Sequence, residues 1–463
     1  MAMKNRLLIF IFLTGTLFSG CESLLEIDPV DEGVILEEDA IQTKQDLQEL
    51  LNAAYDVVNG FYGGHFQRTS ELLGENVVLR DGITDEMVNI YKRYTTGYFT
   101  DNETYDQAYI CILRSNLILE NIDKVSGISS AEAAQMAGEA KFLRGIAHFA
   151  VVRLFAQPYG YTAANDHAGI IIKTNSKVEL LPRNTVAEVY QQIVTDLTEA
   201  EAILPAGNAN FVYATKWAAK AALAQVYFQM HDYDKAYTKA DEVIKSGAFT
   251  FVTNFANYTA NTTESIFKLV SSETSGKRVG SDFGVYRSDG TNIPNIRVAP
   301  DVYKNVIKAG VGDLRASSWY EVFYPGAANE YVAFTRFNSE FPTVPVLRLT
   351  EIKLLRAEAA MLKPSVDKTT AIQDVNDIRQ RAYNGSSRNL AATAANDAVL
   401  NAVRTERRLE LMGEGYNLHD LKRRGSAGES ITIRGVKWDY VGLVIQFGAS
   451  EVNELFTANP EPN

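Results

Sequence analysis

Aromatic and polar side chains gather in two segments of the chain that show no clear helical or strand period. A sugar ring has apolar C–H faces and a polar rim. Tyrosine and tryptophan rings stack on such faces, while amide, guanidinium and carboxylate groups hydrogen-bond to the hydroxyls. This kind of binding needs no proton transfer. The residues that we expect to bind in this way are Trp319, Tyr320, Tyr324, Tyr286, Asn292 and Arg297, with Arg80, Asp81, Tyr91 and Tyr98 closing the other side.

Trp319 is the predicted main platform for the ligand. The chain has only 3 tryptophans, and Trp217 and Trp438 lie in a helical and a strand-like stretch where each has a ready role in the core. Trp319 instead lies in a polar, turn-rich setting. The alternative is that several of these rings pack the loop-rich region, because Tyr and Trp are mostly buried although they are amphipathic.

The sequence carries no motif for catalysis or metal binding. Its 5 histidines form no HExxH pair, and glycine-rich phosphate loops and a GxSxG nucleophile elbow are missing. We therefore predict a protein that is not an enzyme and that uses no cofactor and no metal. With 57 Asp and Glu residues, two carboxylates could still lie at glycosidase spacing by chance. A lipid-anchored glycoside hydrolase thus remains an alternative.

The N-terminus has the pattern of an exported lipoprotein. Lys4 and Arg6 precede the apolar run LLIFIFL, which is too short for a membrane-spanning helix. Small residues then lead to Cys21, as in a bacterial lipobox. We expect residues 1–20 to be a signal peptide cleaved after Gly20, and Cys21 to carry a diacylglycerol and an acylated amine with chains such as palmitate. Several acyl chains would anchor the protein stably. An ordinary signal peptide with an unmodified Cys21 is the alternative.

Charge and helical periodicity describe the rest of the chain. The net charge of −12 argues against a nucleic-acid partner. Residues 21–42 are expected to be a lipidated tether, and helices are expected over 43–247 and 350–463. Thr43 is a predicted helix cap, and the pairs Ser129–Glu132 and Thr185–Glu188 predict two capping boxes. Residues 61–101 are expected to form loops. Residues 248–349 are expected to be a loop-rich ligand-binding subdomain with short strands at 249–252 and 266–270.

Residues 214–247 predict two antiparallel helices. Apolar residues recur three or four apart on both sides of a break at 231–234, and Gly247 lies where a helix-ending glycine would. Small residues let the two backbones approach closely, and such a pair needs stacked neighbours to bury its faces. The pattern resembles a tetratricopeptide (TPR) repeat, and an ordinary helical hairpin is the alternative.

Several blocks, taken in order, resemble the SusD/RagB family of outer-membrane lipoproteins of the Bacteroidetes. The blocks are Cys21–Pro29, Glu139–Arg144, Val152–Phe155, Arg183–Tyr190, the TPR-like pair, Leu349–Ala359, Asn376–Arg379 and Glu406–Leu411. The usual Pro-rich block near the C-terminus is replaced by Val444–Gly448. Within the blocks, Arg144, Arg153 and Glu139 are expected to serve helix–helix ion pairs rather than ligand contacts. Residues 406–410 are expected to form a buried or semi-buried pairing network.

The resemblance implies a mainly α fold, a TPR-like helical-hairpin scaffold with an irregular, short-strand subdomain. It implies a lipid-anchored protein of the cell outer membrane that faces the exterior and works with a SusC-like TonB-dependent transporter. It also implies uptake of glycans or, in some members, of peptides. We expect glycan binding, with peptide binding as the alternative.

Overall fold

The computed structural model describes residues 41–97, 102–207, 211–255, 260–271, 279–289 and 291–462. The predictions for the signal peptide, for Cys21 and for Tyr98 lie outside these residues. Within them, no helix is long and apolar enough to cross a membrane.

Helices dominate the N-terminal half of the described chain. They are α2 (Lys44–Asp56), α3 (Val58–Tyr62), α4 (His65–Leu73), α5 (Glu86–Lys92), α6 (Glu103–Asn121), α7 (Ser130–Phe155), α8 (Val186–Ile203), α9 (Lys216–Gln229) and α10 (Tyr233–Lys245). The prediction of loops over residues 61–101 was wrong, because α4 and α5 lie there. Gly63, Gly64 and Gly74 flank α4 and hide its period in the sequence.

Strands and short helices follow, and then four further helices. The strands are β1 (Val77–Leu79), β2 (Ser265–Val270), β3 (Ile296–Val298), β4 (Tyr320–Phe323), β5 (Tyr331–Phe334), β6 (Thr343–Arg348), β7 (Thr432–Ile433) and β8 (Val436–Lys437). The short helices are η3 (Ser281–Tyr286), α11 (Pro300–Val302), η4 (Tyr303–Ile307), α12 (Arg315–Ser318), η5 (Ser386–Arg388) and η6 (Val441–Leu443). The later helices are α13 (Leu349–Leu362), α14 (Lys368–Ala382), α15 (Asn396–Glu410) and α16 (Asn417–Ser426).

The helix starts follow the predicted capping chemistry. The side chains of Thr43, Ser129 and Thr185 each accept a hydrogen bond from the backbone N–H three residues on, and all three form complete capping boxes. Each cap satisfies backbone donors that the first turn leaves unpaired. The three predicted caps are therefore confirmed, and Asp46 adds a capping box that was not predicted at Thr43.

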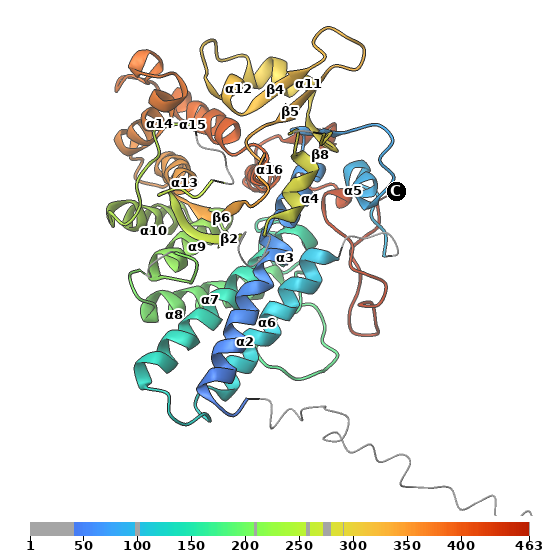
Figure 1. Ribbon diagram of the computed structural model, residues 1–463, viewed down its shortest axis with the longest axis vertical. Coiled ribbons are helices and arrows are strands. Elements are labelled where there is room, and N and C mark those ends of the chain that lie inside the picture. The colour runs from blue at the N-terminus through green and yellow to red at the C-terminus, as the bar shows by residue number, and fades with distance from the viewer. Residues whose placement is uncertain are drawn as a thin grey trace, which may run out of the picture.

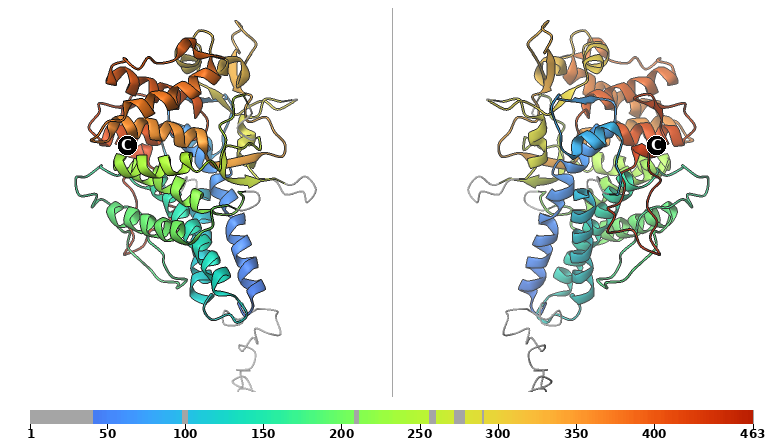
Figure 2. Two further views of the ribbon diagram at one scale, coloured as in Figure 1. Left: turned by 90° about the vertical axis from the view of Figure 1, so that its left-hand side faces the viewer. Right: turned by 90° about the vertical axis from the view of Figure 1, so that its right-hand side faces the viewer.

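Helices that follow one another in sequence pack against one another in space. The chain of contacts runs from α6 through α7, α8, α9 and α10 to α13 and α14. Figure 1 and Figure 2 show α2, α6 and α7 side by side at one end of the molecule, with α13–α15 and β4–β5 at the other. The predicted pair at 214–247 is confirmed as α9 and α10, and Gly247 has a φ of 68° after the last turn.

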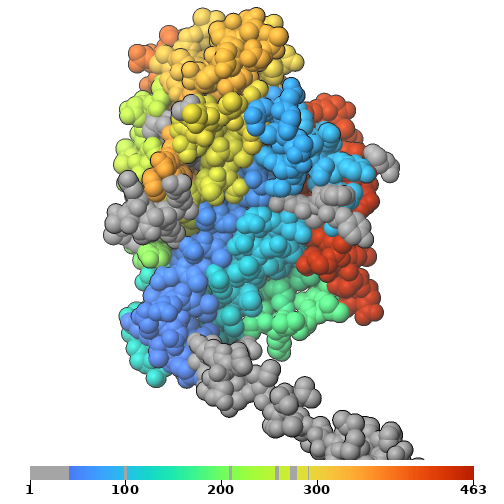
Figure 3. All heavy atoms as spheres, turned by 45° about the vertical axis from the view of Figure 1, so that its right-hand side comes forward, coloured from blue at the N-terminus to red at the C-terminus, as the bar shows by residue number. Residues whose placement is uncertain are grey.

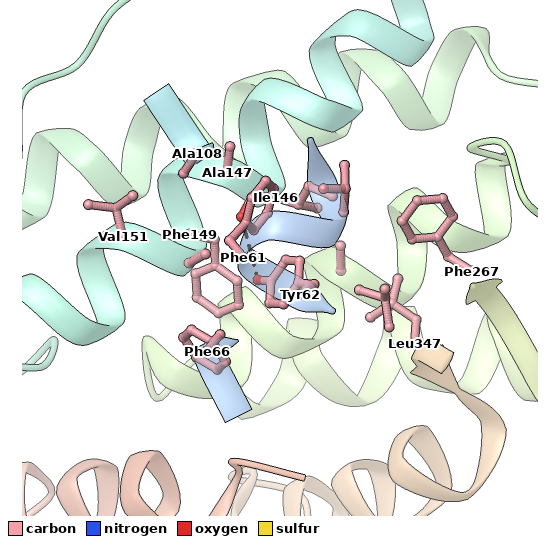
Figure 4. Packing of buried hydrophobic residues seen from close by; sticks show 14 of the residues in the cluster. Phe61, Tyr62, Phe66, Ala108, Ile146, Ala147, Phe149, Val151, Phe267 and Leu347 are labelled. Carbon is pink, nitrogen blue, oxygen red and sulfur yellow. Dashed lines mark hydrogen bonds between the residues drawn. The ribbon is translucent and has the colours of Figure 1, made fainter. Parts of the chain in front are cut away.

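Apolar residues from distant parts of the chain fill the main core. Phe61 and Tyr62 of α3 and Phe66 of α4 lie beside Ile146 and Phe149 of α7 (Figure 4), and all are buried. Burying such side chains is the main favourable contribution to folding. The core thus fixes α3 and α4 onto the long helix α7, and α4 leads directly to β1.

A small sheet brings together segments far apart in sequence. The strand order is β1-β3-β5-β4, all antiparallel, while β2 pairs with β6. The short strand predicted at 266–270 is confirmed as β2, but residues 249–252 form no strand. The predicted mainly α fold with a short-strand region is confirmed.

Buried charges join residues 264–348 to the C-terminal helices. Arg315 lies 2.7 Å from Glu406, and Arg348 lies 2.6 Å from Glu414. Because each buried guanidinium faces carboxylates, the cost of removing its charge from water is offset by pairing. We call this set the buried ion network. Its members are Asp313, Arg315, Arg336, Arg348, Arg381, Glu264, Glu406, Glu410 and Glu414.

The ion pairs expected for Glu139 are not formed. Its carboxylate accepts hydrogen bonds from the Tyr55 hydroxyl and the Gln135 amide. Arg144 pairs instead with Asp196 at 2.6 Å, and Arg153 stacks on Phe149 and donates to Tyr62. The predicted helix–helix ion pair is therefore confirmed for Arg144, which joins α7 to α8, but not for Glu139 or Arg153, whose printed contacts are with neutral groups and aromatic rings.

Candidate ligand-binding site

The four-stranded sheet places several predicted residues on neighbouring strands. Arg297 lies in β3 and pairs across the ladder with Val78 of β1, so Arg80 and Asp81 follow at the adjacent strand end. Val298 pairs with Val332 of β5, which puts Tyr331 close to Arg297. In Figure 3 the blue segment that contains β1 and α5 borders the yellow segment that contains β3. The sheet therefore joins the two predicted sets along this border.

A stack of side chains orders this surface. The Arg297 guanidinium lies 3.8 Å from the centroid of the Tyr331 ring, and Tyr331 stacks on Phe323 at 4.9 Å and 9°. Both faces of Tyr331 are thus covered, so this ring cannot take a ligand. Tyr331 instead holds Arg297 in place, because a guanidinium over an aromatic face is attracted by the ring.

Tyr324 is the exposed ring beside this stack. It is 58% exposed, and it meets Tyr331 edge-on at 6.1 Å. Its φ of 53° is left-handed, a conformation that a residue with a side chain rarely adopts and that costs energy. The sharp turn after β4 directs the chain so that this ring remains exposed to solvent.

The polar groups of the surface have defined partners. Arg80 donates through Nη2 to Oδ1 of Asn295 at 3.0 Å, and its backbone N–H donates to the Asn295 carbonyl. Arg297 donates only through Nε, to Pro294 at 3.4 Å, within the part of the chain that the structure describes. Its two terminal amino groups therefore remain available as donors. Burial lowers the pKa of Arg297, and the positive charge of Arg80 adds to this effect.

We call Arg80, Asp81, Arg297, Tyr324 and Tyr331 the sheet cluster. It contains two guanidinium groups, an exposed carboxylate and one exposed aromatic ring. This combination can stack on an apolar face and hydrogen-bond to the hydroxyls around it without any acid–base step. Sequence reasoning missed Tyr331, whose role follows only from the register of β3 with β5.

Three predicted aromatic residues are buried in the structure. Trp319 is 2% exposed, Tyr320 is 4% exposed and Tyr286 is fully buried. Arg336 lies 4.1 Å over the Trp319 ring, and Phe255 meets it edge-on at 5.5 Å. The placement of Trp319 as the surface platform is therefore corrected: its ring has no open face in this structure. Of the two tryptophans expected in the core, Trp438 is buried, whereas Trp217 is only partly buried.

Two further predicted residues, Tyr91 and Asn292, do not belong to the sheet cluster. Tyr91 lies apart from it, and Asn292 hydrogen-bonds within its own turn. Arg434 lies 4.2 Å over the Tyr91 ring and donates to the Tyr91 carbonyl, so Tyr91 faces the β7–β8 hairpin. Asn292 is exposed, and its amide donates to the carbonyl and the carboxylate of Asp289. Both of its amide hydrogens are used within the turn.

A metal site would need several ligating side chains close together, and a nucleophilic thiol would need to be ionised easily. Among the described residues, no three or more His, Cys, Asp or Glu side chains are grouped as a metal site would require. Cys111 is buried, and burial raises the pKa of its thiol to about 12. A thiol in this state is a poor nucleophile.

Comparisons with known proteins agree over most of the chain. A family model described as "Starch-binding associating with outer membrane" matches residues 28–228, and one described as "SusD family" matches residues 314–440. Two SusD-like proteins of Formosa agariphila are 26% and 27% identical to this chain. The first covers 95% of both chains and the second 91% of both.

Solved structures share the fold. A SusD superfamily protein from Bacteroides thetaiotaomicron VPI-5482 has a TM-score of 0.79 and 23% identity, covering 90% of this chain and 100% of that chain. A laminarin-binding SusD-like protein has a TM-score of 0.71 and 20% identity, covering 91% of this chain and 100% of that chain.

Proposed function

This chain belongs to the SusD/RagB family, and from that membership we propose that it is a non-enzymatic, cell-surface lipoprotein that binds oligosaccharide. It passes the bound oligosaccharide to a SusC-like TonB-dependent transporter of the outer membrane. Cys21 carries the acyl chains that hold it at the outer face of that membrane. The sheet cluster is the ligand site in this proposal.

The exposure of Tyr324 beside the fixed Arg297 is the observation that supports carbohydrate binding best. The ring offers an apolar face, and the terminal amino groups of Arg297 offer donors beside it. Because Tyr331 and Phe323 hold Arg297 in the free protein, little side-chain entropy is lost when a ligand binds. Oligosaccharides present such faces and hydroxyls repeatedly, whereas peptides present them irregularly.

The test measures binding by affinity gel electrophoresis and calorimetry against polysaccharides, including starch and laminarin, and against a peptide library. We expect at least one glycan to bind. Tyr324→Ala should weaken that binding by about tenfold, because one stacking contact is worth roughly 0.5–1.5 kcal/mol beyond the apolar area that it buries. Tyr324→Phe keeps the ring and should bind nearly as tightly as the wild type.

Two other results would replace this proposal. Binding of peptides without any glycan would favour the peptide-import alternative. Release of reducing sugar by the purified protein would favour a glycoside hydrolase. Unchanged glycan binding in Tyr324→Ala would move the site away from the sheet cluster.

A further inference from the structure

A cavity of about 280 Å³ lies between α2, α3 and β2 and shares no lining residue with the sheet cluster. We call it the α2–β2 pocket. Small-molecule sites usually start at about 300 Å³, so its size suits a ligand of one ring. The described residues that line it are Asn52, Tyr55, Asp56, Asn59, Val212, Tyr213, Lys268, Leu269, Val270 and Val279.

One wall of the pocket is an aromatic ring held by the core. Tyr213 is 42% exposed and meets the buried Tyr55 ring edge-on at 5.1 Å. The Tyr55 hydroxyl donates to Glu139 at 2.6 Å and accepts from the N–H of Ala214, the residue after Tyr213. This hydrogen bond fixes the backbone beside Tyr213, so the ring is positioned before any ligand arrives.

A row of polar side chains also lines the pocket. Asn52, Asp56 and Asn59 lie on successive turns of α2 and α3. Asn52 accepts from Gln48, and Asn59 accepts from the N–H of Gly280. Within the described chain neither amide donates a hydrogen bond, so both retain their N–H groups for a ligand.

Lys268 completes the polar lining from β2. It is only 8% exposed, and its ammonium donates to Asn261 at 2.8 Å, which leaves further N–H groups. Among the described lining residues, Asp56 and Lys268 carry charge. A lining with many hydrogen-bonding groups favours a polar ligand, because such groups are costly to bury without partners.

Apolar side chains also line the pocket. Leu269, Val270 and Val279 provide a surface that water solvates poorly. We infer that the α2–β2 pocket is a second carbohydrate site, which takes one sugar ring against Tyr213 and the polar groups of the Asn52–Asp56–Asn59 row. This inference rests on the proposed function, and it implies that one chain can hold a glycan at two separated points.

The experiment separates the two sites with variants. Saturation-transfer NMR is recorded with maltose, cellobiose and laminaribiose on the full mature chain. The starting protein is Tyr324→Ala/Arg297→Met, in which the sheet cluster is weakened. We expect residual binding of at least one disaccharide in this double variant. Adding Tyr213→Ala should weaken the residual binding by about tenfold, and adding Tyr213→Phe should change it little.

Tyr161 supplies a matched control, because it is also 42% exposed but lies outside the α2–β2 pocket. Tyr161→Ala added to the double variant should leave residual binding unchanged. Lys268→Met is a second probe of the pocket and should also weaken binding. Thermal melting of each variant shows whether a loss of binding is a loss of folding.

Each outcome bears on the inference. If Tyr324→Ala/Arg297→Met binds no disaccharide that the wild type binds, or if Tyr213→Ala and Lys268→Met change nothing, the second site is refuted while the proposed function stands. If the pocket variants lose binding of glycylglycine rather than of a sugar, the ligand class is wrong. If the wild type binds no glycan of any kind, the inference and the proposed function fail together.

Discussion

The guanidinium of Arg336 lies 4.1 Å from the centre of the Trp319 ring, inside the protein rather than at its surface. Arg336 also pairs with Glu414 at 2.7 Å, so the ring packs on a member of the buried ion network. Trp319 thereby links the apolar part of the strand region to its buried charges.

Replacing Trp319 is therefore expected to affect stability first. Trp319→Ala should lower the free energy of unfolding by about 3–5 kcal/mol, because a buried aromatic side chain leaves a cavity when removed. Chemical denaturation monitored by circular dichroism measures this. Trp217→Ala is the control and should cost clearly less, since Trp217 is only partly buried. A stable Trp319→Ala protein with weakened glycan binding would restore the ring as a ligand platform.

Glu410 is expected to be a sensitive point of the buried ion network. Its carboxylate faces Arg381, Arg315 and Arg348, which together hold its pKa at about 2 despite the opposing effect of burial. Glu410→Gln leaves buried guanidinium groups short of a partner and should destabilise the protein by about 3–5 kcal/mol.

An exposed pair provides the control for Glu410. Lys437 and Asp439 lie 2.7 Å apart, with the lysine side chain 69% exposed. Lys437→Met should change the free energy of unfolding by about 1 kcal/mol or less. If Glu410→Gln and Lys437→Met change the free energy of unfolding equally in urea denaturation, a buried ion pair contributes no more to stability than an exposed one.

Glu71 should make stability depend on pH. Burial raises its pKa to about 7 from 4.5, although the N–H groups of Gly413 and Gly415 donate to it and partly offset the shift. The folded state therefore holds a proton that the unfolded state has lost between pH 4.5 and 7. The contribution of Glu71 to the free energy of unfolding is therefore greatest below pH 4.5. It falls by about 3 kcal/mol as the pH rises through 7.

The measurement for Glu71 is the difference in unfolding free energy between the wild type and Glu71→Gln at pH values from 4 to 8. This difference should shift in favour of the variant as the pH rises, because Gln cannot ionise. A difference that stays constant with pH would mean that Glu71 is ionised in the folded protein.

The acyl chains on Cys21 are expected to be what attaches the protein to the membrane. Cys21→Ala should leave the fold intact and release the protein from the membrane fraction, because only the acyl chains hold it there. Cell fractionation and mass spectrometry of the lipid measure this. The transporter should be deleted in parallel, since its contact could retain the protein. Retention of an unlipidated variant without the transporter would place the anchor elsewhere.

Local patterns predicted much of the helical scaffold. The caps at Ser129 and Thr185 and the α9–α10 pair were read correctly because each depends on residues within one or two helical turns. The network at residues 406–410 was also predicted, and Glu406, Arg407 and Glu410 are buried and ion-paired.

The site could be predicted only in part. Arg80 and Arg297 were named, but their meeting depends on β1 pairing with β3 across more than two hundred residues. The burial of Trp319 depends on Phe255 and Arg336, which no local pattern connects to it. Composition shows which rings can stack on a sugar, whereas long-range pairing decides which of them remain accessible.

The buried ion network also constrains the order in which the chain becomes stable during synthesis. Arg315, Arg336 and Arg348 leave the ribosome before Glu406, Glu410 and Glu414 exist. Until those acids arrive, closing the strand region would bury three guanidinium groups with only Asp313 and Glu264 of the network to offset their charge, which is unfavourable. The middle of the protein is therefore expected to stay sensitive to proteases until the C-terminal part of the chain is synthesised. In a nascent chain stopped before residue 406, this region should not resist proteolysis.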